Sequence, residues 1–269
     1  MKINNNIYAL EAYRQMLRNQ TLTESHLEKL SSGLRINRSS DDAAGLSISE
    51  KMRSQIRGLG QAERNALDGI SLIQTAEGAL QEVHAMLQRI RELSVQAANE
   101  TNAPEDRQEI QKEVNQLRAE MERIGDNTEF NTKTLLDGQF STQFQIGANE
   151  GQILKVKIPD TRPTALQIDT IDLTTSKGAN EAIGKVEQAI ETIASIRSSL
   201  GAYQNRLEHT VQSLSSTTLN LTAAESRVRD ADMALEMTYF TKQSILNQSA
   251  TAMLAQANQM PQGVLQLLQ

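Results

Sequence analysis

The chain has 269 residues, a formal net charge of −6, no cysteine and only 3% aromatic residues. The absence of cysteine excludes disulfides and thiolate metal sites, and the acidic balance leaves no electrostatic footprint for nucleic-acid binding. Aromatic residues this scarce are unusual in a compact enzyme core, whereas long helices packed through Leu, Ile, Val, Ala and Met need few of them.

Neither a cleaved signal peptide nor a membrane span is predicted. Residues 1–20 include Glu11, Arg14 and Arg18 and lack a continuous apolar run. No segment approaches the ~20 apolar residues that cross a bilayer. We therefore expect no membrane insertion, and any export must use a route that does not read a signal peptide.

Residues 2 to about 34 are predicted to form a helix with two adjacent apolar stripes. A 3.5-residue apolar period keeps one helix face turned toward a partner helix. Polar residues at 20, 21, 23 and 24, with an unexpected His26, interrupt the pattern, so we expect looser packing at that level. One stripe is Ile3, Ile7, Leu10 and Leu17, and the other is Ala9, Tyr13, Met16, Leu27, Leu30 and Leu34.

A polar connector runs from Asn37 to Gly45, and its Ser and Asp side chains, including Asp41 and Asp42, are suited to capping the next helix. That helix is predicted over residues 47 to about 98. Four glycines inside it each cost roughly 1 kcal/mol against Ala, so we interpret them as points of close approach between helices. They are Gly58, Gly60, Gly69 and Gly78.

A further helix is predicted to begin near Pro104, with Thr101 or Asn102 as its cap and an acidic first turn. Residues 143–146 and 154–158 then alternate with period two, which predicts a β-hairpin at about 140–160. Pro159 and Pro163 end it, and residues 164–180 are irregular. Because the chain goes out and comes back, we expect the hairpin at the far tip.

Two helices complete the chain, one from about 181 and one from about 230. Pro261 is expected to weaken or end the last helix. We expect the apolar stripe of this helix to pair with the stripe at the N-terminal end, and then to engage further partners. It consists of Leu246, Ala250, Met253, Ala257, Met260, Val264 and Leu267, spaced alternately by four and three.

The predicted fold class is mainly α: a long antiparallel helical bundle or coiled coil with a small β-hairpin region at the tip. Its domains are discontinuous and built from both chain ends. Residues 1–45 and 226–269 form a terminal coiled-coil domain, and residues 46–225 form a long-helix bundle that includes the hairpin.

Enzymatic and metal-binding sites are not predicted. His26, His84 and His209 share no metal-ligand spacing, and the zinc-protease motif His-Glu-x-x-His is absent. The segment from Gly58 to Gly60 lacks the strand and the Gly-Lys-Ser/Thr of a phosphate loop. We expect no catalytic residue, no metal and no cofactor.

Several strings at both ends resemble bacterial flagellin, in a minimal form without large outer domains. The N-terminal strings are residues 30–37 (LSSGLRIN), 41–46 (DDAAGL), 68–71 (DGIS) and 74–80 (QTAEGAL). The C-terminal strings are residues 224–230 (AESRVRD), 255–259 (AQANQ) and 264–268 (VLQLL).

The resemblance implies a structural subunit that self-assembles into the helical flagellar filament for motility. Such a subunit would be secreted unfolded through the flagellar type III apparatus and would not be an enzyme. The connector between its domains would contain Asn37, Asp41, Asp42 and Gly45. The polymer's inner core would contain Ile3, Ile7, Leu10, Leu17, Leu27, Leu30, Leu246, Met253, Ala257, Val264 and Leu267.

The implied partners are further copies of the chain, a flagellar export chaperone, hook and cap proteins, and the vertebrate Toll-like receptor for flagellin. That receptor would face Arg89, Leu93 and Glu113. One narrow seam per helix buries too little area to offset ordering entropy of roughly 1–2 kcal/mol per residue, so we expect the chain ends to fold on assembly.

Two alternatives remain open from the sequence. A hook–filament junction protein has similar terminal helices and would form a short adaptor ring. An unrelated coiled-coil scaffold would be a stable, fully helical dimer in dilute solution.

Overall fold

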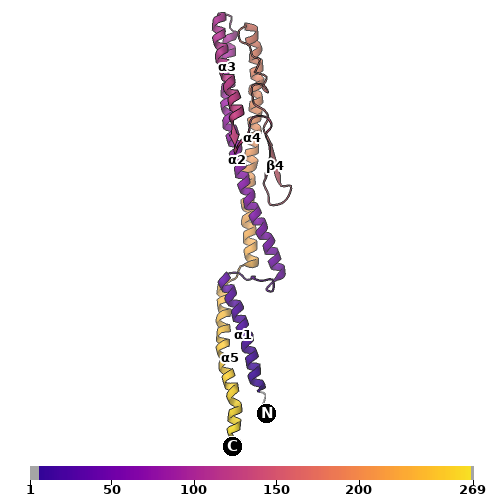
Figure 1. The fold of residues 1–269 in the computed structure, drawn as a ribbon, viewed down its shortest axis with the longest axis vertical. Helices are drawn as coiled ribbons and strands as arrows, with labels where there is room; N and C mark the ends of the chain where they lie inside the picture. Colours follow the sequence, from indigo (N-terminus) through magenta and orange to yellow (C-terminus); the bar gives the residue numbers. More distant parts are fainter. Residues whose placement is uncertain (1–5, 268–269) are drawn as a thin grey trace. The chain divides into compact units, whose positions relative to one another are not determined.

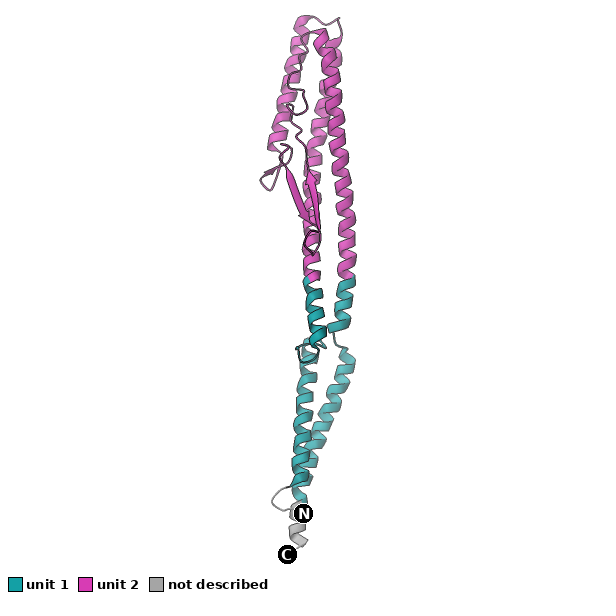
Figure 2. Cartoon of the chain, turned by 90° about the vertical axis from the view of Figure 1, so that its right-hand side faces the viewer, with its two compact units in different colours: residues 1–54, 220–269 teal, residues 55–219 magenta. Residues whose placement is uncertain are grey.

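The computed structural model describes residues 6–267, with side chains as far as residue 260 (Figure 1). Two compact units are present, one made of residues 1–54 and 220–269 and the other of residues 55–219 (Figure 2). The boundaries differ from the expected 45/46 and 225/226. One reason is that the start of α2 (Ala43–Ala98) contacts the end of α4 (Ser176–Arg229): Arg229 Nη1 lies 2.6 Å from Glu50 Oε1.

The unit built from both chain ends is dominated by α1 (Ile7–Ser32) and α5 (Met233–Leu267), which lie side by side and antiparallel (Figures 1 and 2). The side-chain oxygen of Asn6 accepts the N–H of Ala9 at 3.1 Å and caps α1. Gly33 ends that helix with a φ of 71°, a left-handed conformation that glycine adopts without strain.

Helix α5 continues past Pro261 to Leu267, so this proline does not end the helix. Proline lacks the N–H that would bond the carbonyl four residues earlier, that of Ala257. Instead, the Asn6 amide donates to the Ala257 oxygen at 2.7 Å. The acceptor that proline leaves unsatisfied therefore has a partner from the other end of the chain.

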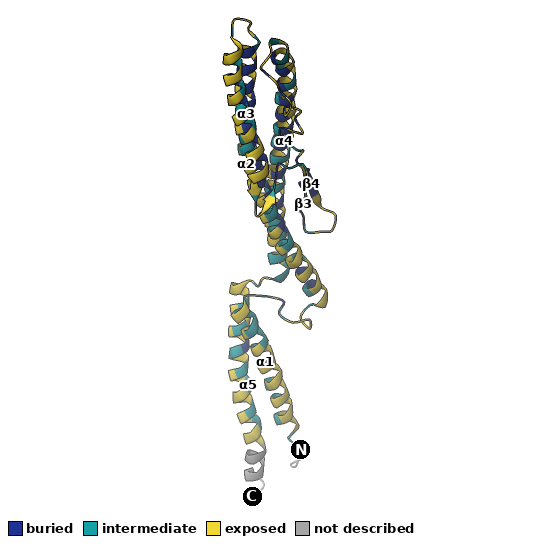
Figure 3. Cartoon of the chain, turned by 45° about the horizontal axis from the view of Figure 1, so that its top comes forward, coloured by how far each residue is buried: buried dark blue, intermediate teal, exposed yellow. Residues whose placement is uncertain are grey.

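In the second unit, the long parts of α2 and α4 pack with α3 (Pro104–Asn127) around an apolar core (Figure 3). Core residues recur alternately at three and four positions, which is the spacing that keeps one helix face buried. The mainly α fold class is confirmed. From α4 the core receives Ala179, Ala182, Val186, Ala189, Ile193, Ile196, Leu200 and Leu207.

The two long inner helices start earlier than expected, at Ala43 and Ser176. The predicted caps of α3 are wrong, because its N-cap is Ala103, whose N–H is accepted by the Asp106 carboxylate at 3.1 Å. Pro104 does occupy the first helical turn. Among the four glycines of α2, added Cβ atoms would lie within 3.4 Å of side-chain atoms at Gly58 and Gly69 but meet nothing within 4 Å at Gly60 and Gly78.

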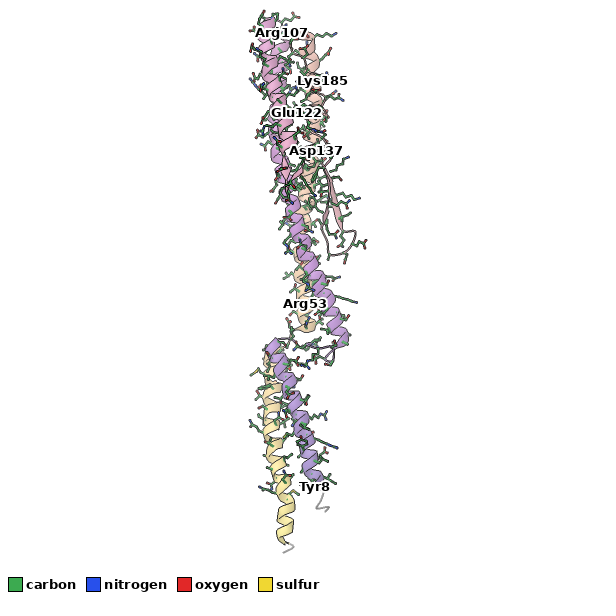
Figure 4. The ribbon with its side chains drawn as sticks, in the orientation of Figure 1. Tyr8, Arg53, Arg107, Glu122, Asp137 and Lys185 are labelled. Carbon is green, nitrogen blue, oxygen red and sulfur yellow. The ribbon has the colours of Figure 1, made fainter. Side chains whose placement is uncertain are left out.

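The predicted hairpin is β3 (Ser141–Gln145) paired antiparallel with β4 (Ile153–Lys157). It lies along residues 58–69 of α2, in the half of the unit away from the α2–α3 turn, and not at the tip: Asn65 of α2 donates to the Gln145 carbonyl at 3.1 Å. The far end is the turn between α2 and α3, where Arg107, labelled in Figure 4, donates to the carbonyls of Ala97 and Asn99. Since α3 runs back along α2, the chain has already returned from the tip when β3 begins.

A second, smaller hairpin pairs β1 (Glu129–Phe130) with β2 (Lys133–Thr134) and was not predicted. Its turn residues, Asn131 and Thr132, have φ angles of 51° and 64°. Both positive angles are typical of a type I′ turn, in which glycine is favoured at the second position. A β-branched threonine there is strained.

Replacing Thr132 by glycine should relieve this strain and stabilise the unit. The left-handed conformation costs a residue with a Cβ about 1–2 kcal/mol, partly offset by the greater freedom of glycine in the unfolded chain. We expect Thr132→Gly to raise the melting temperature of the unit by about 2–4 °C in calorimetry. Thr132→Ala keeps the Cβ and is the control; an equal gain with alanine would rule out backbone strain as the cause.

A cluster of charged residues, Asp137, Asp160 and Arg162, lies next to the segment that follows the small hairpin. Arg162 Nη2 lies 2.9 Å from Asp160 Oδ2 and donates to the carbonyl of Asp137, which Figure 4 labels. The hydrogen bond from Arg162 lowers the pKa of the Asp160 carboxyl. Because this pKa is lower in the folded chain than in the unfolded one, the pair contributes stability above the unfolded value near 3.8, and this contribution is lost as the pH falls through the folded value.

Asp160→Asn should therefore lower the melting temperature at pH 7, and the difference from the parent chain should shrink below about pH 4. Both side chains are partly exposed, so the effect should stay under about 1 kcal/mol. Thermal melts of both proteins from pH 7 to pH 3 measure it. A difference that stays constant over this range would show that the carboxylate charge is not responsible.

Candidate assembly surface

The contact between α1 and α5 follows one stripe on each helix, which we call the seam. Its residues are at least partly buried and recur at alternating spacings of three and four, the period of a coiled coil. On α1 they are Ala9, Ala12, Met16, Asn19, Thr23, His26 and Leu30, and on α5 they are Glu236, Phe240, Gln243, Asn247, Ala250, Leu254 and Ala257.

The centre of the seam is polar. Among the described side chains of α1 and α5, only Asn19 and Gln243 are fully buried, with exposed fractions of 5% and 7%. The Asn247 amide donates to the Thr23 hydroxyl at 2.8 Å. The polar interruption in the sequence, which predicted looser packing, is thus where the two helices make side-chain hydrogen bonds.

His26 adds a contact with a carboxylate near the end of the seam where α5 begins. Its Nδ1 lies 2.6 Å from Glu236 Oε1, and the two side chains are only 20% and 12% exposed. The imidazole also stacks on Tyr239, with ring centroids 5.6 Å apart. The sequence marked His26 as unusual but gave no indication of these partners.

The two chain ends pair as expected, but the predicted apolar stripes are only partly in the contact: Ala9, Met16 and Leu30 of α1 and Ala250 and Ala257 of α5 lie in the seam. Other described residues of these stripes lie beside the seam and are exposed, and we call this surface the outer stripe. Even Tyr8, labelled at the N-terminal end of α1 in Figure 4, is mostly exposed. The outer stripe comprises Ile7, Leu10 and Leu17 of α1 and Leu246, Met253 and Met260 of α5, which are 40–67% exposed.

The other residues expected in a polymer core fall into three groups. Leu30 and Ala257 lie in the seam and are partly buried, whereas Leu27 is 55% exposed. Ile3 lies outside the described residues. Val264 and Leu267 belong to the described backbone of α5, but their side chains lie outside the description.

The four predicted connector residues are brought together at the start of α2. The Asp41 carboxylate accepts the N–H groups of Asn37 and Arg38 at 3.1 and 3.0 Å, and the latter bond is the main reason that its pKa is lowered. Asp42 accepts the Gly45 N–H at 2.9 Å and caps the helix, as predicted. A Cβ on Gly45 would lie 2.4 Å from the Asp42 carboxylate, so this close turn needs glycine.

Backbone pairing also joins the chain segments that leave α1 and enter α5. Leu34 and Asp230 form an antiparallel bridge. Arg35 donates its N–H to the Arg229 carbonyl at 2.7 Å, and Ala231 donates to Gly33 at 3.0 Å. These bonds tie the two ends of the chain together beside the turn that begins α2.

Of the residues expected to face a receptor, Arg89 and Glu113 are about half exposed and bond each other at 3.0 Å. Arg89 also contacts Glu92, and both carboxylates raise its pKa. Leu93 is only 2% exposed and belongs to the core of the long-helix unit, so the expectation that it faces a receptor is wrong. Its position on the buried side follows from the spacing to Ile90 and Ala97.

Among the described residues, no group of three or more His, Cys, Asp or Glu side chains is arranged to hold a metal ion. In the same part of the chain, no helix has the length and apolar character of a membrane span.

Comparison with known proteins identifies both ends. Residues 3–141 match the bacterial flagellin N-terminal helical region, and residues 183–268 match the bacterial flagellin C-terminal helical region. The chain is 54% identical to a flagellin of Halalkalibacterium halodurans and 50% identical to a flagellin of Bacillus subtilis, each over the full length of both chains. It is 49% identical, also over the full length of both, to a 33 kDa flagellar filament core protein of Treponema phagedenis.

Solved structures agree at the level of fold. The crystal structure of Bacillus cereus flagellin is 32% identical and superposes with a TM-score of 0.52, covering 60% of this chain and 94% of the other. A flagellar hook-associated protein of Vibrio parahaemolyticus superposes with a TM-score of 0.61 over 71% of this chain and all of its own, at 12% identity, which shows a shared fold alone. With family models matched at both ends and full-length relatives at this identity, the chain belongs to the bacterial flagellin family.

Proposed function

We propose that this chain is the structural subunit of the extracellular bacterial flagellar filament and that it polymerises through its terminal helices. It is a structural protein and not an enzyme. The observation that carries the proposal is the outer stripe: a flagellin chain leaves large apolar side chains exposed on both α1 and α5, beside a seam that is already filled.

Packing supports contacts between copies through this stripe. Within the described residues, the α1–α5 pair fully buries no apolar side chain, so its own hydrophobic stabilisation is small. Burying a leucine or methionine against a neighbour contributes about 1.5–3 kcal/mol each. Contacts between a stripe on one copy and a different surface on the next do not close, and such contacts generate a helical polymer.

The same shortage of buried surface supports coupled folding and assembly. Ordering each residue costs about 1–2 kcal/mol of backbone entropy, and a single seam with a polar centre offsets little of this. Neighbouring copies supply the missing apolar surface. The terminal helices are therefore folded and paired only part of the time in the free chain, and they become fully ordered in the polymer.

The alternatives carry less support. A hook–filament junction protein shares the fold, but the full-length relatives at about half identity are flagellins and filament core proteins. An unrelated scaffold is not compatible with the family.

Export through the flagellar type III apparatus, with a chaperone on the C-terminal helix and later contacts with hook and cap proteins, extends the proposal to partners. Unfolded ends suit passage through a narrow channel. For the vertebrate Toll-like receptor, Arg89 and Glu113 form the exposed candidate surface, without Leu93.

Replacing Leu17 and Leu246 by glutamine should prevent filament growth. In the single chain the side chain of Leu17 is 44% exposed and that of Leu246 is 40% exposed, so the folded subunit should tolerate the change. Loss of two buried leucines between copies should raise the critical concentration at least about tenfold, since 1.4 kcal/mol corresponds to a factor of ten. Sedimentation and electron microscopy after salting-out measure this.

The matched control is Arg18→Gln with Gln248→Ala, two exposed positions on the same helices outside the seam and the outer stripe. A version lacking residues 1–34 and 230–269 should form no filaments. Unchanged critical concentration in the leucine variant would remove the outer stripe from the proposed contact, and rings or dimers from the full chain would favour a junction protein.

Helix content provides an independent measurement. Circular dichroism of the full chain should show more helix after polymerisation than before, because α1 and α5 gain their apolar partners only then. The truncated version should show no change under the same conditions. Equal helix content before and after polymerisation of the full chain would contradict coupled folding.

Receptor recognition has a separate test. Arg89→Ala removes the ion pair with Glu113 and should reduce receptor signalling several-fold without affecting filament growth, because the pair lies on the surface of the long-helix unit. Lys112→Ala, at a neighbouring exposed pair, is the control. Full signalling by Arg89→Ala would exclude this surface.

A further inference from the structure

We propose that the polar residues of the seam select which faces of α1 and α5 meet within one chain, and so keep the outer stripe turned outward. The selecting contacts are Thr23 with Asn247 and His26 with Glu236, beside the buried polar side chains Asn19 and Gln243. The choice of faces does not depend on the proposed function; only its consequence for assembly does.

The selection is needed because each helix carries two competing faces. The outer stripe lies about one residue, or 100° of helix rotation, away from the seam. Its side chains, such as Leu10, Leu17 and Met253, are more apolar than the polar centre of the seam. The seam also holds large apolar side chains, but fewer in proportion: Met16, Leu30, Phe240 and Leu254 among its fourteen residues. Hydrophobic burial alone would therefore turn the outer stripes toward each other.

The polar contacts fix one alignment of the two helices. Thr23–Asn247 and His26–Glu236 join seam residues at two levels of the pair, and Asn6 bonds the Ala257 carbonyl near the chain ends.

Rotation of either helix would break these contacts together. The Thr23 hydroxyl and the Asn247 amide would separate, and the His26–Glu236 contact, whose side chains are largely buried, would be lost. Directional contacts of this kind specify an arrangement more strongly than they stabilise it, as polar residues in coiled-coil cores do. Near one end, the Asn6 amide holds the same alignment by bonding the Ala257 carbonyl, which Pro261 leaves free.

The backbone bridge at Leu34 and Asp230 does not replace this selection. It fixes the level of the two helices where the chain leaves α1 and enters α5. A helix anchored at one end can still turn about its own axis along the rest of its length. Selection of the face must come from side chains farther along the pair.

Cysteine pairs test the proposal directly, because the chain contains no native cysteine. Ala9→Cys with Ala257→Cys reports contact through the seam, and Leu10→Cys with Met253→Cys reports contact through the outer stripe. Each pair is placed in the full-length chain. Oxidation rates are then measured in dilute solution below the assembly threshold, with single-chain products separated by non-reducing electrophoresis.

With the native polar residues, we expect the seam pair to form its intramolecular disulfide at least about tenfold faster than the outer-stripe pair, the ratio that corresponds to 1.4 kcal/mol. Four alanine substitutions remove the contacts and preserve helix propensity. They are Asn19→Ala, Thr23→Ala, His26→Ala and Asn247→Ala. In that background the ratio should fall to about one or below.

The control makes four alanine substitutions at exposed positions of the same helices: Gln20→Ala, Thr21→Ala, Thr241→Ala and Gln248→Ala. It should keep the native ratio. A seam preference that survives removal of the polar residues would overturn the proposal, as would equal rates in the native background. Neither result depends on whether the chain forms filaments, so failure of the proposed function would be seen separately.

Discussion

Two helices joined along one seam bury little apolar surface, and the other features of the terminal unit follow from this constraint. The α1–α5 pair fully buries Asn19 and Gln243 and leaves leucine, isoleucine and methionine exposed beside them. In an ordinary two-helix hairpin the apolar face would be turned inward and the polar face outward. Here the polar contacts lie between the helices, and the surface with the greater hydrophobic driving force remains available outside.

In the long-helix unit, by contrast, the apolar side chains are buried between the helices. Three helices and a hairpin enclose a core in which Ile73, Leu80, Leu87 and Val186 have no exposed surface. Its glycines at 58 and 69 admit the hairpin and the neighbouring helix to close contact. This unit buries its apolar side chains within itself, and exposed charged residues, such as Arg89 and Glu113, form ion pairs on its surface.

Periodicity in the sequence predicted the long helices, a hairpin at about residues 140–160 and the connector caps, because local spacing and turn chemistry determine these features. Periodicity could not determine which of two adjacent stripes on α1 contacts α5, because both have coiled-coil spacing. The stripe that forms the seam is the more polar of the two. The partner of His26 lies 210 positions away, beyond the reach of any local pattern. Leu93 was misplaced because its role was taken from family resemblance, although its spacing to other core residues already indicated burial.

Asn6 has two attachments: one side-chain atom caps the first turn of α1, and another supplies the bond that Pro261 cannot make in α5. The first turn of α1 and the turn of α5 before Pro261 therefore depend on the same side chain. A subunit that has lost its first few residues would have an uncapped α1 and, at the same time, an unsatisfied carbonyl one turn before Pro261. Damage at the N-terminus would loosen the C-terminal turns as well, so a clipped copy would present two defective helix ends to a growing polymer and not one.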